Sequence, residues 1–340
     1  MNKKYELTDE TKEIGGITLH RIRALRNIPR YGVKSGDLGG WIEAESNLSQ
    51  YGEAWVSGEA WVRGNALVCN NALVSGNARV SDDASVCDNA SVSGNAWVSD
   101  DASVCDNASV CGNARVSDDA RVSDDASVCD NARVSGDARV SDDASVCGNA
   151  RVSDDARVSG NASVCGNARV SRNAWVSGNA SVCGNAIVYK DADYITFKNA
   201  WSSGRYFTYT CSNKMWRVGC FYGNGEELIK KAYADSELSG KCYEAIVRAV
   251  ETIETAKAEA KGEAISNAYG LDKTENKAQL ISAAPELYEA LRMYQEVFAE
   301  IRKSAWFLDA NFHEIMSLNK VMTAADAALA KAAGESEVKE

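Results

Sequence analysis

A six-residue repeat fills the middle of the chain and limits its fold more than any other feature. Between residues 54 and 188 the pattern Ala-x-Val-x-x-x recurs 23 times without a gap, with alanine and valine invariant. Within Ala-x-Val, both apolar residues lie on one face of a short strand. The next three residues are small, polar and turn-prone, as a corner requires. A chain that turns every six residues must coil.

The spacing of the cysteines predicts how many units complete one coil. Eight of the 11 cysteines occupy one fixed position of the repeat, in two series with an interval of eighteen residues: Cys69, Cys87 and Cys105, then Cys111, Cys129, Cys147, Cys165 and Cys183. Three hexapeptides therefore make one coil, and residues eighteen apart stack at about 4.8 Å. Valine and alanine fill the interior, where each buried valine contributes about 1.5 to 3 kcal/mol. We expect caps at both ends, because open coils expose unpaired strand edges.

The first two predicted segments are the N-terminal cap and the β-helix. Residues 1–51 are predicted to form the cap, with a strand from Ile17 to Ala24 that leads into the first coil. Residues 52–193 are predicted to form the β-helix, with nearly eight coils of three hexapeptides. The repeat region is therefore the central and largest domain.

Three further segments are predicted after the repeats. Residues 194–253 are predicted to be a small α+β domain, with a hairpin followed by helices at Glu226 to Ala234 and Gly240 to Ile253. Residues 254–277 are rich in alanine, glutamate and lysine, and are predicted to be a linker or weak helix. Residues 278–335 are predicted to be a helical hairpin with apolar faces, which pair with each other or drive homo-oligomerisation.

The charge and the cysteines exclude several classes of protein. A net charge of −11 disfavours binding to nucleic acid and to anionic membranes. No run of about 18 apolar residues and no secretory leader is found, so we expect a cytoplasmic protein. The cysteines contain no CxxC pair and recur with the repeat, so we expect thiols in a reducing compartment, without disulfides or bound metal.

Several motifs resemble known families. The hexapeptide Val-Ser-Gly-Asn-Ala-Arg resembles the signature of the bacterial hexapeptide transferases, which implies a left-handed parallel β-helix. Residues 19–56, with Gly39-Gly40-Trp41 and Asn47-Leu48-Ser49-Gln50-Tyr51-Gly52, are similar to the start of the YdcK family of β-helix proteins. Residues 276–287 resemble a C-terminal helical segment of phage and prophage proteins, and residues 194–253 resemble a domain that follows such repeats. These resemblances imply a phage or prophage origin.

Stacking at eighteen residues turns the exposed positions into polar columns. Asparagine forms an unbroken column, in which we expect the side-chain amides to bond along the stack: Asn77, Asn95, Asn113, Asn131, Asn149, Asn167 and Asn185. Aspartate forms a second column, in which like charges at about 4.8 Å repel: Asp83, Asp101, Asp119, Asp137 and Asp155.

Two arginine columns lie on the adjoining strands: Arg115, Arg133, Arg151 and Arg169, then Arg121, Arg139 and Arg157. The plain interpretation is surface pairing of these arginines with the aspartate column, in which each pair contributes little. The alternative is a striped surface for a charged partner, phosphate-bearing ligands included.

Tryptophans share these columns. Trp61 and Trp97 stack with Arg79 between them, and Trp55 and Trp175 also face outward. Such tryptophans cover a cap or a neighbouring domain, or they form a binding platform in which Arg79 stacks between rings. The complete candidate binding surface is Trp61, Arg79, Trp97, Arg115, Arg121, Arg133, Arg139, Arg151, Arg157, Arg169 and Trp175.

An acyltransferase reaction is disfavoured by the residues present. The hexapeptide transferases use a histidine base and usually a loop that projects from the coil, but no insertion interrupts residues 52–189. The chain's two histidines, His20 and His313, lie outside the repeats. Nucleotide-binding and metal-binding spacings are also missing from the sequence, so we expect no catalytic, cofactor-binding or metal-ligating residues and no cofactor.

The combined features favour a non-catalytic phage or prophage binding protein that acts in the host cytoplasm. It would inhibit host defence by sequestering a signal molecule or by blocking a host protein, so its partner is a host protein or a small phosphate-bearing ligand. The alternatives are a structural scaffold or virion-associated protein, and a hexapeptide acyltransferase. Mimicry of DNA by the acidic columns stays open, although the seven column arginines weaken it.

Overall fold

The computed structural model describes residues 3–199 and 204–269, with side-chain environments up to residue 260. The chain forms two compact units, Met1–Gly223 and Asn224–Glu340. The first unit contains the N-terminal cap, the repeats and a small antiparallel sheet. The second unit contains two helices within the described residues.

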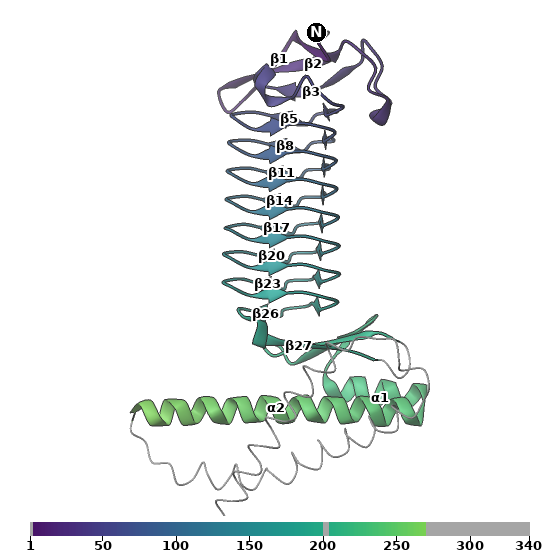
Figure 1. Ribbon diagram of the computed structural model, residues 1–340, viewed down its shortest axis with the longest axis vertical. Coiled ribbons are helices and arrows are strands. Elements are labelled where there is room, and N and C mark those ends of the chain that lie inside the picture. Colours follow the sequence, from purple (N-terminus) through teal and green to yellow (C-terminus); the bar gives the residue numbers. More distant parts are fainter. Residues whose placement is uncertain (1–2, 200–203, 270–340) are drawn as a thin grey trace, which may run out of the picture. The chain divides into compact units, whose positions relative to one another are not determined.

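The repeats form a parallel β-solenoid with three faces (Figure 1). The first face contains β5 (Trp61–Val62), β8 (Arg79–Val80), β11 (Trp97–Val98), β14 (Arg115–Val116), β17 (Arg133–Val134), β20 (Arg151–Val152), β23 (Arg169–Val170) and β26 (Ile187–Val188). The second contains β6 (Leu67–Val68), β9 (Ser85–Val86), β12 (Ser103–Val104), β15 (Arg121–Val122), β18 (Arg139–Val140), β21 (Arg157–Val158) and β24 (Trp175–Val176). The third contains β4 (Trp55–Val56), β7 (Leu73–Val74), β10 (Ser91–Val92), β13 (Ser109–Val110), β16 (Ser127–Val128), β19 (Ser145–Val146), β22 (Ser163–Val164) and β25 (Ser181–Val182).

Residues eighteen apart are paired, which confirms three hexapeptides per coil. Val116 pairs with Val134, and the amide of Arg115 donates to the carbonyl of Ala132 at 2.9 Å. Every repeat alanine and valine is at most 1 % exposed, so the interior contains these two residue types throughout. The corners need a residue with positive φ, and at Gly94 (φ 69°) an added Cβ would lie 2.8 Å from the carbonyl oxygen of Gly112.

The N-terminal cap extends the first face. β1 (Tyr5–Ile14) and β2 (Ile17–Ala24) form an antiparallel hairpin, and β3 (Leu38–Ile42) pairs with β2 and then, in parallel, with β5. The expected strand from Ile17 to Ala24 is confirmed by β2. Short 3₁₀ turns, η1 (Pro29–Tyr31) and η2 (Glu45–Asn47), complete the cap.

A four-stranded antiparallel sheet follows the last coil. After the turn η3 (Asp191–Asp193), it contains β27 (Tyr194–Lys198), β28 (Tyr206–Thr210), β29 (Met215–Val218) and β30 (Phe221–Gly223), in that order. β28 and β29 form the expected hairpin. The rings of Phe197 and Phe207 stack at 4.8 Å, and Trp216 packs edge-on against both. β28 also contacts β25, so the sheet covers the open end of the solenoid.

The second unit begins with two packed helices, α1 (Gly225–Asp235) and α2 (Glu237–Tyr269). Asn224 caps α1, because its Oδ1 accepts from the amide of Glu227 at 2.9 Å while Glu227 accepts from the amide of Asn224. Leu228 and Ile229 of α1, with Val247 of α2, form part of the buried apolar set. No helix within the described ranges is long and apolar enough to cross a membrane.

The boundaries after the repeats differ from those expected. The expected domain at 194–253 is divided between the units, because the sheet ends the first and the helices begin the second. The segment expected at 254–277 to be a linker or weak helix is helical as far as Tyr269, in keeping with its strong helix formers and with the second of these alternatives. The helical hairpin expected at 278–335 lies outside the described residues.

Candidate functional site

The first face of the solenoid presents a ladder of four arginines, Arg115, Arg133, Arg151 and Arg169, here called the first-face ladder. Parallel pairing places each arginine directly beside the next, on β14, β17, β20 and β23. The valine that follows each arginine is buried, so strand alternation turns every guanidinium outward, and all four residues are exposed. The result is a straight row of cations on a rigid surface.

The expected pairing of column arginines with column aspartates is wrong. No arginine of either ladder forms an ion pair within 4.0 Å in the described part of the chain. Adjacent guanidinium groups repel by up to about 1 kcal/mol per pair in water. An anionic ligand that contacts several of them would relieve this repulsion.

A different set of carboxylates explains how the acidic corners are stabilised. At each corner the residue before the expected column adopts positive φ, as Asp118 (φ 59°) and Asp154 (φ 57°) do. Its carboxylate accepts from a backbone amide of the next coil: Asp118 from Gly136 at 3.0 Å and Asp154 from Arg172 at 3.0 Å. The carboxylates of these aspartates therefore bond to the backbone of the next coil and not to the arginines of the face. Glycine, asparagine or aspartate at nearly every sixth residue is the sequence signal of these positive-φ positions, and it was not used to predict them.

The asparagine column beside the first-face ladder is confirmed. Each side-chain Nδ2 donates to the Oδ1 eighteen residues later, at 3.0 to 3.2 Å, from Asn77 through Asn185. Each amide has two N–H donors, and the stack uses one of them. The corner between the third and first faces is therefore neutral along most of its length and keeps one donor per coil for other partners.

The tryptophans occupy three different environments. Trp55 and Trp61, expected to face outward, are buried at 1 % and 7 % exposure, because the N-terminal cap covers them. Arg79 does not stack between two rings: its guanidinium lies 6.0 Å from the ring centre of Trp61. Arg115, at 5.5 Å, stacks on the half-buried Trp97 instead. Trp55 and Trp61 therefore pack against the cap and do not form an exposed binding platform.

The second face carries three exposed arginines, Arg121, Arg139 and Arg157, here called the second-face ladder. The ladder ends at Trp175, which pairs with Arg157 and is 49 % exposed. Trp175 Nε1 donates to Ser159 Oγ at 2.9 Å, so the ring has a fixed orientation. Arg157 and Trp175, together with Asp155, Asn173 and Asp191, line a hollow of about 450 Å³.

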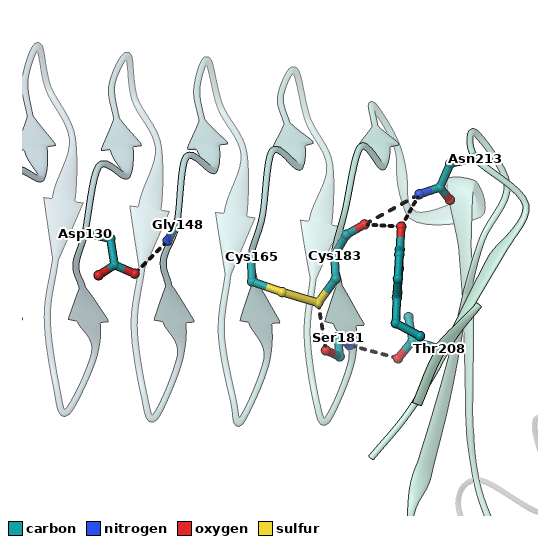
Figure 2. Close-up of a disulfide and its surroundings, with 8 residues drawn as sticks. Asp130, Gly148, Cys165, Ser181, Cys183, Thr208 and Asn213 are labelled. Carbon is teal, nitrogen blue, oxygen red and sulfur yellow. Dashed lines mark hydrogen bonds between the residues drawn. A yellow bond between two sulfur atoms is a disulfide. The ribbon is translucent and has the colours of Figure 1, made fainter. Parts of the chain in front are cut away.

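The cysteines do not all remain thiols, contrary to expectation. Cys165 and Cys183 form a disulfide between adjacent coils, with Cα atoms 4.6 Å apart (Figure 2). The stack places neighbouring cysteines within bonding range, but stacking alone does not determine the side-chain orientation that a disulfide needs. Burial raises the pKa of Cys69 to about 11 and, with a hydrogen bond to Asp106, that of Cys105 to about 12. These thiols are protonated at neutral pH and therefore weak nucleophiles.

The remaining candidates for chemistry lie apart from the ladders. His20 is in β2 of the cap, where its Nδ1 is 3.4 Å from the carbonyl oxygen of Thr8. His313 lies outside the described residues. One group of metal-ligating atoms, from Cys129, Asp130 and Cys147, gathers at a corner, although the sequence spacing predicted no metal site.

Two family models match the chain. YdcK β-solenoid repeats match residues 108–178 in seven overlapping segments, within the repeats and C-terminal to the region that carried the resemblance in sequence. Residues 237–336 match Salmonella phage P22 protein Y8K6. No curated protein matches the chain. The protein therefore joins a YdcK-type β-solenoid to a C-terminal segment similar to a phage P22 protein.

Proposed function

We propose that the protein is a non-catalytic, phage-encoded binding protein that holds a phosphate-bearing partner against the first-face ladder. The observation that supports this most is the row of four exposed arginines in direct register, none of them in an ion pair within the described ranges. Arginine binds phosphate oxygens with two parallel N–H groups, and a row of such groups can engage several phosphates at once.

The surroundings favour the first-face ladder over the second-face ladder. The first-face ladder borders the asparagine column, which is neutral and offers N–H donors. The second-face ladder lies between two acidic corners, which carry Asp119, Asp137 and Asp155 on one side and Asp124 and Asp142 on the other, whereas the first-face ladder borders only the first of these corners. Because these carboxylates repel anions, we expect the first face to bind the ligand.

The chain's net charge of −11 restricts the partner. A long polyanion such as nucleic acid would contact the aspartates of the corners as well as the arginines, and would be repelled. We therefore favour a small phosphate-bearing molecule as the partner. We infer that the protein acts in the host cytoplasm and sequesters such a signal molecule, which would inhibit a host defence. The phage P22 match at residues 237–336 supports the phage setting.

The test compares the two ladders by calorimetric titration of the full chain with pyrophosphate and a panel of linear and cyclic nucleotides. The first-face variant replaces Arg115, Arg133, Arg151 and Arg169 with glutamine, and the matched control replaces Arg121, Arg139 and Arg157. We expect the first variant to weaken binding at least tenfold and the control to retain it. Equal loss in both variants, or no binding of any probe by the wild type, contradicts the proposal.

A stiff scaffold is the second candidate function. Both ends of the solenoid are covered by other parts of the first unit, so the coils form a spacer of fixed length. Affinity purification from infected cells, combined with analysis of purified virions, separates the two functions. Recovery of a small ligand with the protein supports sequestration, whereas presence in virions without ligand supports the scaffold.

A further inference from the structure

At the corner between the third and first faces, the second residue is an aspartate in one coil and a glycine in the others. In each coil this corner needs positive φ at its second residue, and seven coils place glycine there: Gly58, Gly76, Gly94, Gly112, Gly148, Gly166 and Gly184. The one remaining coil, the fifth along the chain, has Asp130 at this position, with φ 59°. Its Oδ2 accepts from the amide of Gly148 at 3.0 Å (Figure 2). The residue is therefore held in place, and its carboxylate lies between two coils.

Two cysteines of the same corner flank this carboxylate. Cys129 precedes Asp130 in the chain, and Cys147 stacks on Cys129 one coil further on. The two Sγ atoms and a carboxylate oxygen of Asp130 all lie within 4.8 Å of one another. Cys129 Sγ is 3.9 Å from Asp130 Oδ2. Both cysteines are half-buried, so the three donors form a compact group with one side open to solvent.

This spacing is close to that of a tetrahedral metal site. Zinc lies about 2.3 Å from thiolate sulfur and about 2.0 to 2.2 Å from carboxylate oxygen, so neighbouring donors are separated by roughly 3.5 to 3.8 Å. The observed separations exceed this by at most about 1 Å. Small rotations of side chains at a solvent-facing corner are enough to close the difference.

We propose that Cys129, Asp130 and Cys147 form a binding site for a thiophilic divalent cation such as Zn²⁺. Two thiolates and one carboxylate provide three ligands, and water completes the tetrahedron. Binding displaces the two thiol protons to solvent. The cation links adjacent coils without a covalent bond, two coils before the disulfide that links Cys165 to Cys183.

Among the described residues, the other repeat cysteines do not bring two thiols and a carboxylate this close together, although Cys87, Asp88 and Cys105 have the same spacing in sequence. Cys111 is followed by glycine, and Cys165 and Cys183 are joined to each other. In the second cysteine column, Cys105 Sγ approaches Asp106 Oδ2 at 3.1 Å. No second group of three such donors comes as close together within residues 3–199 and 204–260. The site therefore depends on Asp130 and on the stacking of Cys129 with Cys147.

The test titrates cadmium chloride, without oxygen or reductant, into the full chain with its disulfide intact. We expect one cadmium ion per chain to produce the ultraviolet charge-transfer band of cadmium thiolate, and zinc chloride to displace it. Asp130→Gly and Cys129→Ser should each weaken binding at least tenfold. Both substitutions place residues that the repeat already uses at these corner positions, so the fold is retained.

The double variant Cys87→Ser, Cys105→Ser is the matched control, because it removes two thiols from the other column and should leave cadmium binding unchanged. A wild-type chain without the charge-transfer band overturns the proposal, as does equal binding by Asp130→Gly. Peptide mapping provides a second check: a disulfide between Cys129 and Cys147 in the purified protein also overturns it.

Discussion

The two ends of the solenoid are closed in different ways. At the N-terminal end the sheet of the first face continues into the cap, since β3 pairs in parallel with β5, and the aromatic rings of Trp41, Trp55 and Trp61 are buried there. At the C-terminal end, no strand of the described residues continues the three faces. The antiparallel sheet instead supplies side-chain acceptors: Thr208 Oγ1 for the amide of Ser181 at 2.8 Å and Ser212 Oγ for the amide of Ile187 at 2.7 Å.

This difference shows that an open coil can be closed by packing or by polar side chains. The N-terminal end satisfies its backbone groups with further strands and gains stability from apolar burial. The C-terminal end satisfies individual amides with hydroxyl groups, and a disulfide links its last coils. We therefore expect the stability of the N-terminal end to depend on the volume of its buried side chains. The stability of the C-terminal end should depend on individual hydrogen-bonding and sulfur atoms.

The largest effect is expected from Trp55→Ala, which removes a ring that is 1 % exposed in the cap. The cavity should lower the free energy of unfolding by about 3 to 5 kcal/mol, as measured by urea denaturation. Trp175→Ala is the control, because this ring is 49 % exposed on the second face and should cost much less. Equal losses would show that packing does not dominate the N-terminal end.

A smaller effect is expected from Cys183→Ser, which removes the disulfide at the other end. The bond closes a loop of 18 residues, so its loss should lower the free energy of unfolding by about 3 kcal/mol. Hydrogen exchange should accelerate in the last two coils and stay unchanged near the cap. Cys87→Ser, which removes a thiol outside the disulfide, serves as the control. Uniform acceleration along the solenoid would contradict a local role.

A still smaller loss in the free energy of unfolding is expected from Thr208→Val at the C-terminal end. The substitution preserves shape but leaves the amide of Ser181 without its acceptor, and an unsatisfied group of this kind costs about 1 to 3 kcal/mol. Thermal unfolding measures the loss, and Thr196→Val, at an exposed position of β27, is the control. If both variants unfold at the same temperature, the hydroxyl of Thr208 does not close this end.

The smallest effect concerns Lys4, which is fully buried in the cap and donates from Nζ to the carbonyl of Ala54 at 2.7 Å. Burial, with a contribution from Arg26, lowers its pKa to about 8. The unfolded chain keeps this proton up to about pH 10.5, so the unfolded state binds more protons between pH 8 and 10.5 and stability rises with pH there.

The change from pH 8 to pH 9 should stabilise the wild type by about 1 kcal/mol relative to Lys4→Met. Urea denaturation of both proteins at the two pH values isolates the contribution of Lys4 to the pH dependence of stability, because the ionisation of thiols and tyrosines is common to both proteins. A difference that stays constant between the two pH values would contradict the lowered pKa of Lys4 in the folded cap.

Short-range periodicity made most of the first unit predictable. The Ala-x-Val pattern and the eighteen-residue cysteine interval predicted three parallel faces, and register alone predicted the asparagine stack that the hydrogen bonds confirm. The hairpin at β28 and β29 followed from alternation. These features depend on neighbours in the chain or in the next coil, which the repeat fixes.

The remaining features depend on side-chain direction or on packing between distant segments. The burial of Trp55 and Trp61 required the position of the cap, which no repeat encodes. Arginine and aspartate columns lie on adjoining surfaces, but positive φ at the corners turns a neighbouring set of carboxylates, such as Asp118, toward backbone amides. The disulfide and the cluster around Asp130 join residues eighteen apart, so spacing rules for motifs such as CxxC could not detect them.

The uniform interior has a consequence for how such a chain can change length. Each coil contains the same six buried side chains, three alanines and three valines, so one coil can replace another without repacking. Gain or loss of eighteen residues returns the polypeptide to the same face and changes the separation of the two closing structures by about 4.8 Å. Gain or loss of six residues would instead present the wrong face to the C-terminal sheet. The distance between the two closing structures can therefore change in steps of one coil through gain or loss of eighteen-residue units.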